Sequence, residues 1–441
     1  MMKIRLLLLS LLVFLAASQS VAQTVYNVND CIKTGLDRNY SLLITRNSEA
    51  IAKNNHTIGN AGYLPTLDLT GRHSGTLNDI RTNLGDTSET FTNNVHNTTS
   101  TGSLSLGLTL FDGFNVQTTY RKLGELKKLG SLNTQLSIEN LVADIVSAYY
   151  NYIQQVKLLD NLRYAVSLSR ERLRIDEDRY LLGSSSKLQV LQSRVYLNAD
   201  SSRLSKQYET VHASQVRLNE LMAVDDLNGK FITRDTTIDI GQALLFEKLL
   251  EETMVKNTSL QIASANKAVS EYDYKLAKSR SYPYLTASSG YNYNYNTFSS
   301  SSNKNQQTNG LNYGVTLGFN IFDGFNQRRS INNSSIELQS KELRYQEMEQ
   351  GVKADLITIY SAYNNYLRLI ELEKQNLSTA TENLSIAMER YKLGSLSGID
   401  LREVQKSLLD ARESLLSVQY LTKLAEISLN LISGRILDYY K

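Results

Sequence analysis

Two stretches of the chain alternate strictly between apolar and polar residues. Leucines occupy every second position from Leu104 to Leu110, and larger apolar residues do so from Leu311 to Ile321. The segment YNYNYN at 291–296 alternates Tyr with Asn in the same way. A period of two predicts strands of about ten residues, paired as one hairpin in each half of the chain. Polar loops are expected near 76–100 and 298–309.

One face of these strands is apolar, and the other carries Gly, Asn, Ser and Thr. Such a pair of faces suits lipid on one side and water on the other. We expect Tyr291, Tyr293, Tyr295 and the odd positions from 311 to 321 on the lipid side. A strand of a soluble sandwich would show the same alternation, so this pattern alone leaves both interpretations open.

The period then changes to seven. One unbroken heptad column in the first half contains Ile138, Ile145, Tyr152, Leu159, Val166, Leu173 and Tyr180. A second column runs from Leu356 to Tyr391, and both indicate coiled-coil helices. A helix over 115–182 would be roughly 100 Å long. Helices are also expected over 28–62, 186–222 and 243–281. The simplest packing flanks each long helix with two shorter ones placed end to end.

The chain is an internal duplication. The pentapeptide FDGFN occurs at Phe111 to Asn115 and again at Phe322 to Asn326, 211 positions later, and Pro65 and Pro283 are the only prolines. The ordered parts therefore predict a first repeat over 23–222, with helix, β-hairpin, long helix, tip turn and helix in that order. A linker or equatorial segment over 223–242 and a second repeat over 243–441 follow.

Each FDGFN joins an outgoing strand to a long helix. The junction residues are Phe111, Asp112, Gly113, Phe322, Asp323 and Gly324. Glycine relieves the backbone where its direction changes, and the phenylalanines suit a membrane interface. Aromatic packing inside a soluble turn is the alternative for these phenylalanines.

The first 22 residues predict a secretory signal peptide, because Lys3 and Arg5 precede an apolar run from Leu6 to Ala17. The only cysteine, Cys31, lies too far from that run for a lipoprotein and excludes an internal disulfide. The formal net charge of +3 gives no reason to invoke nucleic acid. No later stretch reaches the eighteen or so apolar residues that a transmembrane helix needs.

Four strands cannot close a barrel around water, and open edges are not tolerated in lipid. The sequence therefore predicts a homo-oligomer whose strands form a common barrel and whose helices form a common tube. An enzyme is not expected. The four histidines, His56, His73, His96 and His212, show no metal-ligand spacing, and no nucleophile motif or cofactor-binding loop is present.

The duplicated layout with its two prolines, two FDG junctions and two LGS turns resembles the TolC-type outer membrane efflux proteins. The resemblance covers nearly the whole chain after residue 22. It implies a mixed fold, with a twelve-stranded membrane β-barrel formed by a trimer and a long α-helical coiled-coil tunnel crossing the periplasm. It also implies an exit duct in the outer membrane that docks a periplasmic membrane-fusion adaptor and an inner-membrane pump of RND or ABC type. A soluble periplasmic coiled-coil scaffold is the alternative. As cargo, the resemblance implies a drug, a metal ion or a secreted protein.

The resemblance also implies functional residues at the helical tips. Adaptor docking is expected at Leu182, Gly183, Ser184, Leu393, Gly394 and Ser395. The alternative is that the glycines only terminate helices. Asp400 and Glu403, with Tyr391, are expected at the periplasmic entrance constriction, although Ser397 with Asp400 also fits a helix cap. Gln189 and Leu396 replace an acid and an arginine that latch the tips in the family, so closure is expected to differ here.

Overall fold

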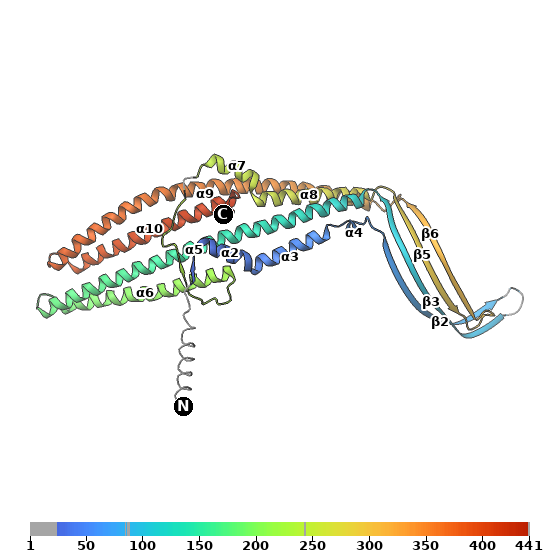
Figure 1. Ribbon diagram of the computed structural model, residues 1–441, viewed down its shortest axis with the longest axis horizontal. Helices are drawn as coiled ribbons and strands as arrows, with labels where there is room; N and C mark the ends of the chain where they lie inside the picture. The colour runs from blue at the N-terminus through green and yellow to red at the C-terminus, as the bar shows by residue number, and fades with distance from the viewer. Residues whose placement is uncertain (1–23, 84, 86–88, 242–243, 440–441) are drawn as a thin grey trace, which may run out of the picture. The chain divides into compact units, whose positions relative to one another are not determined.

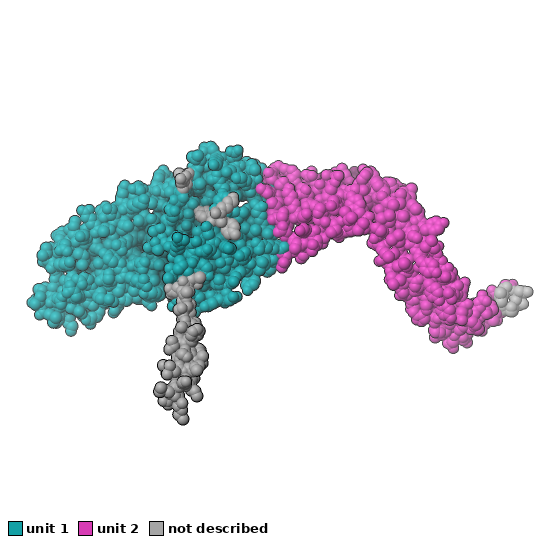
Figure 2. Space-filling model, in the orientation of Figure 1, with its two compact units in different colours: residues 1–46, 134–260, 349–441 teal, residues 47–133, 261–348 magenta. Residues whose placement is uncertain are grey.

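The computed structural model describes residues 24–83, 85, 89–241 and 244–439. The predicted signal peptide lies outside these residues. The chain forms two compact units (Figure 2). Of the described residues, those within 24–46, 134–260 and 349–439 form one unit, here called the helical unit, and those within 47–133 and 261–348 form the other, the strand unit. Each unit takes segments from both sequence repeats, so the spatial units cut across the duplication.

The strand unit contains one antiparallel sheet of four strands (Figure 1). They are β2 (Thr66–Asn83), β3 (Glu89–Asp112), β5 (Tyr284–Thr297) and β6 (Asn305–Gly318), in the order β2-β3-β5-β6. The prediction of a polar loop near 76–100 is wrong, because β2 and β3 remain paired as far as Asn83 and Glu89. This stretch is rich in Thr, whose branched side chain suits a strand even where both faces are polar. The second loop, predicted at 298–309, ends earlier, where β6 begins at Asn305.

Register places most apolar residues of the four strands on one face. Leu69 lies opposite Leu104, Leu104 opposite Tyr291, and Tyr291 opposite Leu311. Residues directly opposite one another in an antiparallel pair share a face. The same face carries Leu67, Leu106, Leu108, Phe111, Leu285, Ala287, Tyr313, Val315 and Leu317. The other face carries small and polar residues, among them Asp68, Thr70, Ser103, Ser105, Gly290, Asn292, Gly310, Asn312 and Thr316.

The sheet is open within one chain. Strands β2 and β6 are its two edges, and each pairs with a neighbour on one side only. A two-faced sheet with two free edges cannot enclose water by itself.

The predicted 28–62 and 243–281 helices are each interrupted at an asparagine. Asn39 separates α2 (Val28–Arg38) from α3 (Tyr40–Asn55), which α4 (Ile58–Ala61) follows. Asn257 separates α7 (Phe246–Lys256) from α8 (Thr258–Ser279). Asn39 Oδ1 accepts from the N–H of Leu42 (3.2 Å), and Asn257 Oδ1 accepts from the N–H of Leu260 (3.0 Å). An asparagine that bonds nearby backbone offers the chain an alternative to continuous helix.

Four further helices carry the coiled-coil pattern. These are α5 (Asn115–Leu181), α6 (Lys187–Met222), α9 (Asn326–Lys392) and α10 (Gly398–Ile432), and α5 and α9 each have 67 residues. A short 3₁₀ segment, η2 (Ile436–Tyr439), follows α10. None of the described helices is both long and apolar enough to cross a bilayer.

A small parallel pair of strands joins the 223–242 segment to the helical unit. Strand β4 (Phe231–Thr233) pairs with β1 (Thr24–Tyr26), which the sequence pattern did not predict. Phe231 is buried against Tyr152, with ring centroids 5.0 Å apart, and Tyr149 Oη donates to Asp235 (2.7 Å). The segment is therefore fixed to the core of the helical unit.

Candidate functional site at the helical tips

The two tip turns have the same backbone geometry. Gly183 has φ +74° and Gly394 has φ +82°. The N–H of Ser184 donates to the carbonyl of Arg179 (2.9 Å), and the N–H of Ser395 donates to that of Arg390 (3.0 Å). Together with the glycine N–H bonds to Tyr180 and Tyr391, these contacts form Schellman motifs. The glycines thus terminate α5 and α9, whereas Leu182 and Leu393 stay 82% exposed.

The acidic pair, Asp400 and Glu403, lies in the first two turns of α10. Ser397 Oγ accepts from the N–H of Asp400 (3.2 Å) and donates to its Oδ2 (2.7 Å), so Asp400 takes part in a helix cap. Glu403 follows one turn later, is exposed, and makes no ion pair within the described part of the chain. Capping accounts for Asp400 but not for Glu403.

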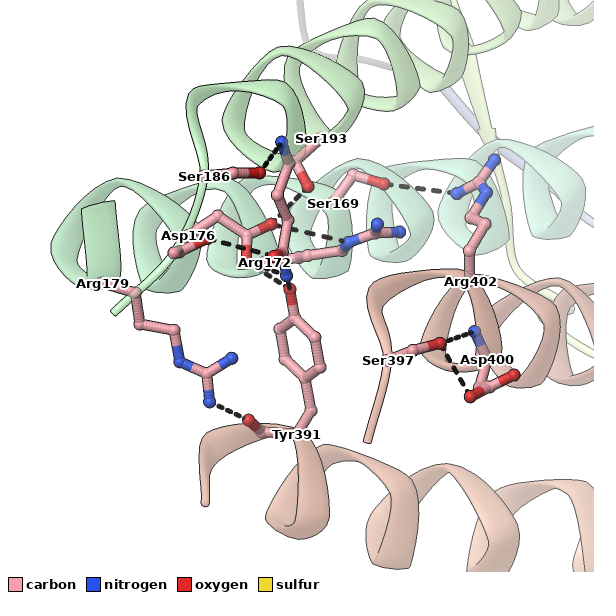
Figure 3. A network of polar contacts seen from close by, with 12 residues as sticks. Ser169, Arg172, Asp176, Arg179, Ser186, Ser193, Tyr391, Ser397, Asp400 and Arg402 are labelled. Carbon is pink, nitrogen blue, oxygen red and sulfur yellow. Dashed lines mark hydrogen bonds and ion pairs between the residues drawn. The ribbon is translucent and has the colours of Figure 1, made fainter. Parts of the chain in front are cut away.

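Tyr391 contacts α5 and α6 instead of this acidic pair (Figure 3). Its side chain is fully buried; its Oη donates to Asp176 Oδ1 and accepts from Gln189 Nε2 (3.1 Å). Burial, and then the hydrogen bond to Asp176, raise the pKa of Tyr391. The three residues predicted for one constriction are therefore divided, within one chain, between a buried contact and an exposed pair.

Asp176 is the centre of the buried contact. It is fully buried and accepts from Tyr391 of α9 and from two residues of α6, Gln189 Nε2 (3.2 Å) and Ser193 Oγ (2.5 Å). The buried guanidinium of Arg172 lies 3.9 Å away. A buried carboxylate needs such donors, because removing one leaves its desolvation uncompensated. Gln189 thus serves as a donor where the resemblance leads one to expect an acid.

A second link joins α10 to α6. Arg402 donates two hydrogen bonds to the carboxylate of Asp200 (2.7 and 2.8 Å), to which Ser169 Oγ of α5 also donates (2.5 Å). Burial alone would raise the pKa of Asp200, but the hydrogen bonds from Arg402 and Ser169 outweigh it and hold the pKa below its ordinary value. Arg402 also lies over the ring of Tyr196, 5.0 Å from its centroid.

A third link joins α5 to the C-terminal end of α9. Arg179 of α5 donates to the backbone carbonyl of Tyr391, and its guanidinium lies 4.9 Å from the centroid of the Tyr391 ring. The three links together, here called the tip network, hold the pair α9/α10 to the pair α5/α6. Figure 3 shows the contacts of Tyr391 with Asp176 and Arg179, and that of Arg402 with Ser169.

Sequence reasoning missed most of the tip network. Ala165, Ser169, Arg172 and Asp176 follow one another at spacings of four, three and four. That is the spacing of a coiled-coil seam, and its last three positions are polar. Polar residues in a seam were the signal for buried contacts of this kind.

The FDGFN junctions lie in the strand unit and are alike in both repeats. The rings of Phe111 and Phe114 pack edge to face at 5.3 Å, as do those of Phe322 and Phe325. Asp112 accepts from the N–H of Val116 (3.1 Å) in the first turn of α5. In the second repeat Asp323 accepts from the N–H of Gln327 (2.7 Å) in the first turn of α9. Gly113 and Gly324 have φ of +67° and +69° and make the turn.

Comparison with known proteins gives one family and one fold. The family described as outer membrane efflux protein matches residues 32–224 and 249–435. No curated protein sequence matches the chain. The outer membrane protein VceC of Vibrio cholerae is 16% identical and has a TM-score of 0.72, and the match covers 92% of this chain and 96% of VceC. The CmeC outer membrane channel of Campylobacter jejuni is 15% identical with a TM-score of 0.76, and the match covers 92% of this chain and 85% of CmeC. CusC is 17% identical with a TM-score of 0.75, and the match covers 93% of each chain.

Proposed function

This chain belongs to the outer membrane efflux protein family, and we propose that three copies form one exit duct for a tripartite efflux or secretion system. The family is one of channel proteins and not of enzymes. In the proposed duct, the strands span the outer membrane and the helices form a tunnel in the periplasm.

The open two-faced sheet is the observation that carries the proposal. All neighbouring strands are antiparallel in the order β2-β3-β5-β6, so β2 and β6 run in opposite directions. Strand β6 of one copy can therefore pair with β2 of the next in the same antiparallel sense. Three copies give a closed barrel of twelve strands, with the apolar face toward lipid and the polar face toward water.

Exposed apolar residues at heptad spacing support contacts between copies. On α3, Ile44 and Ile51 are 66% and 60% exposed, and on α9, Ile336 and Leu343 are 61% and 65% exposed. Such seams are stable only when a second helix covers them. Neighbouring copies supply that helix in the proposed trimer.

The tip network supports a closed state of the tunnel entrance. Separating α9/α10 from α5/α6 would break the contacts of Asp176 and Asp200, two buried carboxylates. In this proposal a membrane-fusion adaptor binds the exposed tips around Leu182 and Leu393 and offsets that cost, while an RND or ABC pump supplies the cargo. Asp400 and Glu403 from three copies form an acidic ring at the entrance, and the 223–242 segment encircles the tunnel.

Cell fractionation tests the proposal. The full chain should be recovered in the outer membrane as trimers that dissociate on heating, and should conduct ions in planar bilayers. Recovery in the soluble periplasm without conduction would favour the alternative, a coiled-coil scaffold. Site-specific crosslinking from Leu182 and Leu393 to an adaptor expressed with the chain tests the docking part separately.

A further inference from the structure

Arg172 of α5 is a buried cation whose hydrogen-bonding capacity is not used. Its side chain is 2% exposed, and its Nε and Nη1 have no hydrogen-bond partner among the described residues. Its Nε lies 3.9 Å from Asp176 Oδ2, which is too far for a hydrogen bond. Buried N–H groups of a charged side chain cost free energy when they are unpaired, so other contacts must hold the guanidinium in this position.

Two neighbours hold it there. The guanidinium lies over the ring of Tyr196 of α6, 5.0 Å from the ring centroid. The first residue of α10, Gly398, lies against it, because a Cβ at this glycine would be 2.9 Å from Arg172 Nη2. The position is helical, and its equivalent in the first repeat is Lys187, the first residue of α6. The close approach of the guanidinium, and not the backbone conformation, therefore requires glycine at position 398.

The carboxylate of Asp176 has other donors in this arrangement (Figure 3). Its Oδ1 accepts from Tyr391 Oη and Gln189 Nε2, and its Oδ2 accepts from Ser193 Oγ. Of these donors only Tyr391 belongs to the pair α9/α10, because the other two lie on α6. Separating the two helical pairs would therefore remove one donor and leave the carboxylate short of a partner.

We infer that Arg172 is the partner that Asp176 takes when the tunnel entrance opens. The inference rests on the proposed function, because it assigns an open state to the tip network. Residues four apart on one helix remain neighbours wherever the pair α9/α10 moves. Once Gly398 and Tyr391 withdraw, the guanidinium rotates and donates two parallel hydrogen bonds to the carboxylate. This exchange of partners lowers the cost of opening, so that the closed entrance is held but not locked.

The second repeat shows that the coiled coil does not need this pair. The residues equivalent to Arg172 and Asp176 are Asn383, which is exposed, and Ala387, which is buried in an apolar cluster. Replacing a buried ion pair by apolar packing is often neutral or stabilising. The presence of the pair in α5, in contact with Tyr391, therefore fits a role in exchanging partners better than a role in folding.

Single-channel recording from trimers in planar bilayers tests the inference through the sign of one effect. In Arg172→Met, Asp176 keeps its three closed-state donors but loses its open-state partner. We expect this variant to open about tenfold less often than the wild type, the factor that a charge-assisted hydrogen bond provides. Loss of an ordinary closing contact would have the opposite effect. The control, Arg170→Met, removes an exposed arginine of the same helix and should open like the wild type.

Gly398→Ala tests the same contact from α10 and does not depend on how well Arg172→Met assembles. The added Cβ displaces the guanidinium from its closed position, so this variant should open more often than the wild type. In Arg172→Met/Gly398→Ala that increase should be lost, because methionine ends short of the position of Nη2.

Opening of Arg172→Met as often as the wild type, or more often, would overturn the inference. So would opening of Gly398→Ala at the wild-type frequency, or an increase that persists in the double variant. Wild-type trimers that do not conduct would instead refute the proposed channel, and the inference with it.

Discussion

The phenol of Tyr391 donates a hydrogen bond to the buried carboxylate of Asp176, joining α9 to α5 across 215 positions of sequence. Tyr180, the counterpart of Tyr391 in the first repeat, is instead 46% exposed. The duplicated sequence thus places the same residue in two environments, and only one of them connects the two helical pairs.

Removing the Tyr391 hydroxyl should favour an open entrance. In Tyr391→Phe, Asp176 loses one of its donors, which costs about 1–3 kcal/mol in the closed arrangement. We expect higher single-channel conductance in planar bilayers with normal trimer levels. Tyr180→Phe, the matched change at an exposed position, should leave conductance unchanged. Equal conductance of the two variants would remove Tyr391 from the closing contacts.

The Asp200–Arg402 link should make closure depend on pH. Because the pKa of Asp200 is lowered in the folded protein, its contribution is complete above the ordinary aspartate pKa of about 3.9 and is lost as the pH falls through the lower folded value. Conductance of the wild type should therefore rise as the pH falls below that range.

Removing the charge of Asp200 provides a test of this pH dependence, and removing that of Asp178 provides the control. Asp200→Asn should conduct more at neutral pH and lose that part of the acid response. Asp178→Asn, which removes an exposed carboxylate on α5, should retain it. An acid response in Asp200→Asn equal to that of the wild type would assign the effect to other groups.

The two faces of the sheet should tolerate charge differently. Leu317→Arg places a charge on the apolar face, where it costs about 2–4 kcal/mol at the bilayer midplane. Its neighbour Thr316 lies on the polar face, so Thr316→Arg should be tolerated far better. The measurement is the yield of heat-sensitive trimers, and equal damage from both changes would contradict the assigned faces.

The acidic pair should select cations at the entrance. Asp400→Ala with Glu403→Ala should lose cation preference and block by multivalent cations while trimers remain intact. Glu403→Gln alone separates this role from capping, because the contacts of Ser397 involve only Asp400. Glu382→Gln, at an exposed position of the neighbouring helix α9, serves as the control. Unchanged selectivity in the double variant would leave Asp400 with its capping role alone.

The tip serines should separate docking from turn formation. Each hydroxyl donates to a carbonyl of its own turn, Ser184 to Arg179 and Ser395 to Arg390 (both 3.1 Å). Ser184→Ala/Ser395→Ala removes these bonds and should preserve export. Ser184→Tyr/Ser395→Tyr adds bulk at the proposed adaptor surface and should abolish export with normal trimer levels. Export by the tyrosine variant would place the adaptor elsewhere.

The sequence predicts this fold well wherever a repeating pattern extends over many residues. The heptad column that ends at Tyr180 anticipates α5 almost to its last residue, Leu181. Alternation from Leu311 onward anticipates a strand with one apolar face, which the register with Tyr291 extends across the sheet. These patterns are informative because the same type of side chain recurs at a fixed spacing over many residues.

Features that depend on single long-range contacts could not be read in this way. Strands β2 and β3 continue to pair beyond Thr98, where the pairing of β3 with β5 ends. This extension does not alternate between apolar and polar residues, so the sequence pattern did not reveal it. Asp176 and Tyr391 meet only because two hairpins of helices pack together, and nothing local to either residue specifies the other. The break at Asn39 was likewise hidden, since a single asparagine is tolerated in many helices.

The free edges of β2 and β6 have a genetic consequence. In the proposed trimer each copy supplies one third of the barrel wall through these edges. A mutant copy with a damaged edge that assembles with two normal copies therefore prevents closure of the whole barrel. In a cell that expresses normal and damaged genes together, most assemblies would contain at least one faulty member. Edge mutations in this protein should therefore be dominant.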